Sequence, residues 1–98
     1  MTNSAAQKRA DAIQAVTDLV IDPENGYQVR PEMSVSKAVK AVRDLAKLGR
    51  TPRWHAALKQ WESMILECDD FEKQGSEWRE RMHWAILQGG VYALHAGI

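Results

Sequence analysis

The chain has 98 residues, of which 45% are hydrophobic and 27% charged, and its formal net charge at pH 7 is zero. This composition is typical of a globular protein and excludes collagen-like, low-complexity and disordered classes. No apolar run of about 18 residues is present, so we expect no membrane span, and the first residues lack the apolar core of a secretory signal. A single cysteine provides neither an internal disulfide nor a multi-cysteine zinc site, and we expect a cytoplasmic protein.

The pattern of turns and apolar residues predicts four helices, over residues 5–21, 35–48, 52–73 and 77–95. Proline and glycine at positions 23, 26 and 31 predict a loop over 22–34 between the first two helices. Residues 1–4 are expected to be a flexible N-terminus. The sequence therefore predicts an all-α fold, a small four-helix bundle-like single domain covering residues 1–98, with short loops.

Each of the first three predicted helices has one apolar face. Thr51-Pro52 is a strong start signal for the third, with Thr as the N-cap and Pro at the first helical position. Cys68 falls on the apolar face of that helix and is interpreted as a small core residue. Acidic residues 67–72 would lie at its C-terminal end, where they oppose the helix dipole.

The fourth predicted helix has two apolar seams. At 100° per residue they lie on roughly opposite sides of the helix, so it must be buried on both sides. The first seam consists of Trp78, Met82, Ala85, Gly89, Tyr92 and Ala96. The second seam consists of Trp84, Leu87, Val91 and Leu94. Three other helices enclose one side easily, and we expect the second seam to meet another chain, with burial inside this domain as the alternative.

Gly89-Gly90 leaves two possibilities open for the fourth helix. Each glycine in a helix interior lowers helix stability by roughly 1 kcal/mol relative to alanine. In the first possibility, the pair therefore ends the helix at Gln88. In the second, they allow another helix to approach closely.

Charge is unevenly distributed despite the zero total. Seven basic and two acidic residues lie between Gln28 and Arg53, whereas seven acidic and two basic residues lie between Gln60 and Glu80. Both regions are interpreted first as solvated faces, and alternatively as regions that steer a partner of opposite charge.

No catalytic motif is recognisable in the sequence. There is no phosphate-binding loop, dinucleotide fingerprint, metalloprotease HExxH or nucleophile elbow. His55, His83 and His95 lack further ligands at a spacing that favours a metal. We therefore expect a protein that is not an enzyme and has no catalytic residues, no metal and no cofactor.

The leading functional hypothesis is a protein-interaction module, a small regulator or inhibitor of the antiactivator type. It would cover a partner's surface with an apolar helix face, and the partner would be a protein such as a transcription factor or a nuclease complex. We expect a homodimer when the chain is free. The expected protein-binding residues are Trp84, Leu87, Val91 and Leu94, with His83 between the two seams as a group that tunes the contact with pH.

The alternative hypothesis is a helix-turn-helix DNA-binding regulator. Residues 48–51 join the second and third predicted helices through a short turn that contains glycine, although the small residues Ala46 and Gly49 are three rather than four apart. The third helix becomes acidic after its start, which opposes phosphate binding. The nucleic-acid-binding residues in this hypothesis are Lys37, Lys40, Arg43, Lys47, Arg50 and Arg53.

Overall fold

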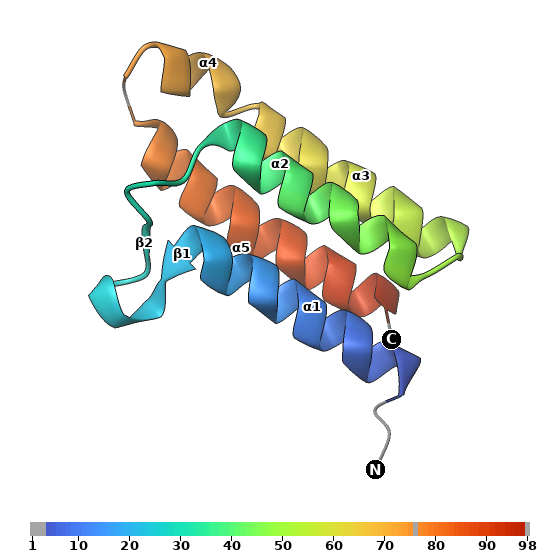
Figure 1. Cartoon of the computed structure of the whole chain (residues 1–98). Helices are drawn as coiled ribbons and strands as arrows, with labels where there is room; N and C mark the ends of the chain where they lie inside the picture. The colour runs from blue at the N-terminus through green and yellow to red at the C-terminus, as the bar shows by residue number, and fades with distance from the viewer. Residues whose placement is uncertain (1–3, 76, 98) are drawn as a thin grey trace.

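The computed structural model describes residues 4–75 and 77–97, and most of these are helical (Figure 1). The predicted all-helical character is confirmed, with the addition of one small sheet. In chain order the elements are α1 (Ala5–Val20), β1 (Ile21–Asp22), the 3-10 helix η1 (Pro23–Asn25), β2 (Gln28–Val29), α2 (Val35–Asp44), the 3-10 helix η2 (Leu45–Leu48), α3 (Pro52–Leu66), α4 (Asp69–Lys73) and α5 (Trp78–Gly97).

Hydroxyl side chains cap the N-termini of α1, α2 and α3. The Oγ atoms of Ser4 and Ser34 accept hydrogen bonds from backbone N–H groups three residues later, at 3.1 and 3.3 Å. Thr51 Oγ1 accepts from the N–H of Trp54 at 3.1 Å, and Pro52 follows the cap as expected. Each cap satisfies a donor that a helix start leaves without a partner. Apart from Ser4, the predicted flexible N-terminus lies outside the described residues.

The four longer helices enclose one apolar core. Helix α5 packs against α3 and α1, and α2 packs against α3. Figure 1 shows that the axes of these helices are roughly aligned. The largest side chains that are fully buried include Trp54, Trp61, Ile65, Met82 and Ile86.

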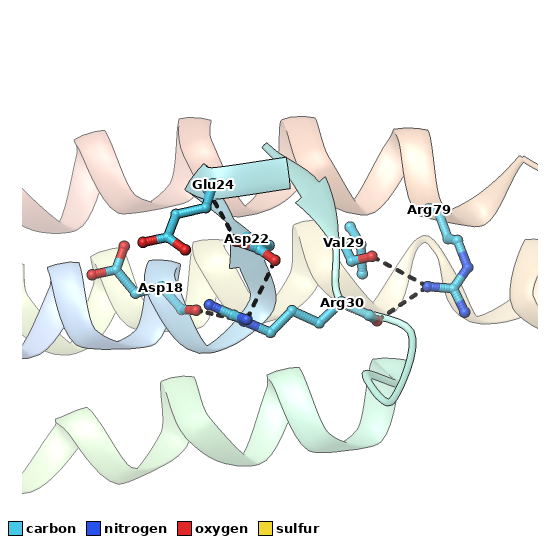
Figure 2. A network of polar contacts seen from close by, with 6 residues as sticks. All are labelled: Asp18, Asp22, Glu24, Val29, Arg30 and Arg79. Carbon is cyan, nitrogen blue, oxygen red and sulfur yellow. Dashed lines mark hydrogen bonds and ion pairs between the residues drawn. The ribbon is translucent and has the colours of Figure 1, made fainter. Parts of the chain in front are cut away.

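The predicted loop over 22–34 contains a small antiparallel hairpin instead. Strands β1 and β2 pair Ile21 with Val29, and both side chains are buried. As Figure 2 shows, Arg30 donates to the carbonyl of Asp18 at 2.9 Å, which ties the hairpin to the end of α1. Arg79 of α5 donates to the carbonyls of Val29 and Arg30 at 3.5 and 3.1 Å. The hairpin is therefore fixed to two helices.

The predicted continuous helix over 52–73 is interrupted at residues 67 and 68. Helix α3 ends at Leu66, a tight turn follows in which the N–H of Cys68 bonds to the carbonyl of Ile65, and α4 begins at Asp69. Asp69 and Asp70 consequently occupy the first turn of a helix. There they complement the helix dipole, whereas the sequence had suggested that they oppose it.

Gly89-Gly90 does not break the last helix. Helix α5 continues through both glycines to Gly97, and both are buried. An ideal Cβ at Gly89 would lie 2.0 Å from Cδ1 of Trp61, a distance that no real contact adopts. The second possibility is therefore correct, because the missing side chain lets the indole of α3 lie directly against the backbone of α5.

Candidate protein-binding surface

The side of α5 that faces away from the core carries four apolar residues, together with the exposed Gln88 and His95. Trp84 is 57% exposed, Val91 53% and Leu94 37%, and Leu87 is half-buried. We call these four residues the outer α5 face. On the opposite side of the same helix Met82, Ile86 and Ala93 are fully buried, so the core occupies only one side. The predicted excess of apolar surface on this helix is present.

The outer α5 face lies in a stretch whose only titratable side chains are two histidines and a tyrosine. From Met82 to Gly97 there is no Asp, Glu, Lys or Arg, although 27% of the whole chain is charged. Helix surfaces that only meet water normally carry charges, and the centres of protein–protein interfaces are depleted of them. The composition of this stretch is therefore typical of a surface that becomes covered.

The hairpin borders one flank of the outer α5 face. His83 Nδ1 lies 2.7 Å from the carbonyl oxygen of Tyr27, and because a carbonyl only accepts, the ring donates from Nδ1. Tyr27 has a left-handed φ of 57°. The His83 ring also meets Trp84 edge to face, with centroids 5.4 Å apart. His83 therefore positions the neighbouring indole and is itself held by the hairpin.

A groove of about 380 Å³ borders the other flank, next to Trp84. Its lining includes Met64 of α3, Phe71 of α4, and Ala85 and Gln88 of α5. The guanidinium of Arg81 lies 3.9 Å over the Phe71 ring and closes one end. Burial raises the pKa of the Cys68 thiol on the same wall, as does the nearby charge of Glu67.

No protein-family model, curated protein or solved structure matches the chain. The surface must be interpreted from its own chemistry.

The first predicted seam of the last helix is partly wrong. Trp78, Met82, Ala85 and Gly89 are buried as expected, but Tyr92 is 57% exposed. Ile86 and Ala93, which neither seam contained, replace it in the core. The core stripe follows the 3.6-residue period and drifts away from a strict 4-3 spacing within three turns. Tyr92 belongs to the exposed surface on the α3 side, next to the groove.

The six basic residues of the DNA-binding alternative are all exposed. Arg43 forms an ion pair with Glu62 of α3 at 2.6 Å, and that contact raises the pKa of Arg43. Lys37 donates to the carbonyl of Glu32. Helices α2 and α3 lie side by side in opposite directions in Figure 1. The DNA-binding alternative, including its helix-turn-helix, stays a prediction.

The other candidate sites have fewer features of a binding site than the outer α5 face. A second, shallow groove of about 610 Å³ lies between α1 and α2, with three basic and three acidic residues among its lining. Within residues 4–75 and 77–97, no three His, Cys, Asp or Glu side chains gather as a possible metal site. No helix in this part of the chain is long and apolar enough to cross a membrane.

Proposed function

We propose that the chain is a non-enzymatic protein-interaction module that binds another protein through the outer α5 face. The observation that carries this proposal is the exposed indole of Trp84 at one end of a four-residue apolar surface, within a stretch that lacks charged residues. Buried tryptophans are frequent among the residues that dominate binding energy, and half of this side chain is available for burial. The scaffold is a small four-helix bundle-like domain in the cytoplasm.

The mode of action in this proposal is occlusion. A helix face that covers an apolar surface of a transcription factor or a nuclease complex prevents that surface from engaging its own partner. The chain then acts as a small regulator or inhibitor of the antiactivator type, without any chemical step. The uneven charge distribution would set the orientation and rate of docking more than its affinity.

A photo-crosslinking experiment in cells tests the proposal. A photoreactive residue at Val91 is compared with one at Lys59, an exposed position of α3 outside the outer α5 face. We expect protein adducts from position 91 and none from position 59. Trp84→Ala should remove these adducts, since truncating a central interface tryptophan costs about 2 kcal/mol or more.

Leu66→Ala is the matched control for Trp84→Ala, because Leu66 is a similarly exposed apolar residue of α3. Circular dichroism would verify that both variants remain folded. Adducts that are equally frequent from both photoreactive positions, or that persist in the Trp84→Ala protein, would contradict the proposal.

A further inference from the structure

We infer that the occupant of the outer α5 face is a second copy of this chain, docked with the two α5 helices antiparallel. The inference rests on the proposed function, because the second copy covers the same face while the chain is free and leaves it when the other protein binds. The twofold axis would cross the helix pair at the level of Gly89.

The spacing of the outer α5 face is symmetric about that level. Trp84 and Leu94 are each five residues from position 89, and Leu87 and Val91 are each two residues from it. Turning one helix end over end about this level places Trp84 opposite Leu94 of the partner copy and Leu87 opposite the copy's Val91. A twofold interface needs a surface that is complementary to itself, and each of the four apolar residues is paired with another of them. The exposed Gln88 and His95 lie beside these pairs.

The charges at the two ends of the molecule favour the antiparallel orientation. At one end, residues 67–81 contain six acidic and three basic residues. The other end brings together the C-terminus of α5, the first turns of α1 and the connection from α2 to α3, as Figure 1 shows. That end contains five basic and two acidic residues, Lys8, Arg9, Lys47, Arg50 and Arg53 with Asp11 and Asp44.

A parallel pair would place the two acidic ends together and the two basic ends together. The antiparallel pair places each acidic end beside the basic end of the other copy, which steers the encounter into this orientation. Residues 82–97 between the ends contain no Asp, Glu, Lys or Arg, so with both histidines neutral the centre of the interface introduces no like-charge repulsion.

The groove beside Trp84 and the exposed Tyr92 lie on the same side of α5. In an antiparallel twofold pair, the α3 side of one helix faces the α3 side of the other. The twofold rotation brings position 92 of one copy to the level of position 86 of the other, which lies between Ala85 and Gln88 along the helix. Tyr92 of each copy would therefore be on the same side of the pair, and at the same level, as the groove that Met64, Phe71, Ala85 and Gln88 line in the other copy. In a parallel pair Tyr92 would face the α1 side instead.

The molar mass in solution tests whether the second copy binds. Light scattering over micromolar to near-millimolar concentrations should give a mass that rises to about twice 11.1 kDa. Trp84→Ala should weaken this dimerisation at least about thirtyfold, the ratio that corresponds to loss of a binding hot spot. Leu66→Ala should leave the dimerisation constant unchanged. A wild-type protein that remains monomeric throughout would overturn the inference.

Paired cysteines test the orientation. Leu87→Cys and Val91→Cys proteins are oxidised separately and then as an equal mixture, with Cys68 left in place because its thiol is buried. Disulfides need Cα atoms within about 7 Å. The antiparallel pair brings position 87 next to position 91 of the other copy, so we expect strong cross-linking only in the mixture. A parallel pair would cross-link each single variant to itself.

These outcomes separate the two proposals. A monomeric chain whose position 91 still cross-links to other proteins overturns the second copy as partner and leaves the proposed function standing. A dimer that cross-links within each single variant overturns the antiparallel arrangement. A monomeric chain without any adduct from position 91 overturns both.

Discussion

Gly89 shows how one missing side chain determines the packing of two helices. The Trp61 indole lies so close to the α5 backbone that a methyl group at position 89 would overlap it, at 2.0 Å from Cδ1 and 2.4 Å from Cγ. Trp61 is fully buried and has no room to withdraw. The adjacent Gly90 differs, because a methyl group there would meet Ile13, Thr17 and Trp61 at 3.7 Å, an ordinary contact distance.

We therefore expect alanine at the two positions to change the free energy of unfolding in opposite directions. Gly89→Ala should lower the free energy of unfolding by about 1–3 kcal/mol, since overpacking outweighs the gain in helix propensity. Gly90→Ala should raise it by about 0.5–1 kcal/mol, because alanine is the better helix former and fits without overlap. Urea denaturation of the two variants beside the wild-type protein measures both effects. Equal changes at the two positions would disprove this account of α5 packing.

The outer α5 face could be predicted from single residues, but its boundary could not. Trp84, Val91 and Leu94 repeat with a period that any helical projection places on one side. Tyr92 was assigned to the core because a 4-3 spacing was extended too far along a straight helix. The groove beside it depends on where α4 turns away from α3, and no local pattern specifies that position.

At the scale of elements, Arg9 holds the end of α5 against α1. Its Nε and Nη2 donate to the carbonyl of Gly97 at 3.0 and 2.7 Å, and Nη1 donates to the carbonyl of Leu48 at 3.4 Å. The guanidinium also lies 5.8 Å from the centre of the Trp54 ring. A cation at a helix C-terminus satisfies carbonyls that lack intrahelical donors and complements the dipole. One side chain thus connects α1, η2, α3 and α5.

Replacing Arg9 should loosen this end of the molecule. Arg9→Met retains much of the apolar stem but removes the charged hydrogen bonds, so we expect a loss of about 1–3 kcal/mol in the free energy of unfolding. Amide exchange should become faster in the last turn of α5 and remain unchanged near Trp78. Lys8→Met, at the exposed neighbouring position, is the control and should have little effect. Unchanged exchange in the last turn of the Arg9 variant would refute the role assigned to it.

The helices were largely predictable and the irregular elements were not. The cap at Thr51 is a local signal that the sequence predicts, and the structure uses it. The hairpin was missed because each strand has only two residues, too few for an alternating pattern. Its position depends on the distant Arg79, whose bonds to the hairpin carbonyls cannot be deduced from the residues around positions 22–34.

At the scale of the whole molecule, the long helices share one contiguous core. Residues from α1, α2, α3 and α5 belong to the same buried cluster, and β1 and β2 contribute Ile21 and Val29 to it. No helix can leave this cluster without exposing apolar area of the others. The single-domain prediction made from the chain length therefore leads to a measurable expectation.

Unfolding should occur in one cooperative step. Far-UV circular dichroism reports the helices, and tryptophan fluorescence reports the environment of the core residues Trp54 and Trp61. We expect urea curves from the two probes to coincide, as for other small domains. Measured at a fixed protein concentration, curves with separate midpoints would indicate independently stable parts and contradict a single domain.

The exposures of the four tryptophans have an optical consequence. Three indoles are enclosed, at 1%, 0% and 8% exposure for positions 54, 61 and 78, and only Trp84 is open to water. A collisional quencher such as iodide must therefore act mainly on the emission of that one residue. The native protein carries a spectroscopic reporter at its candidate interface, and shielding of this emission would follow complex formation without any added label.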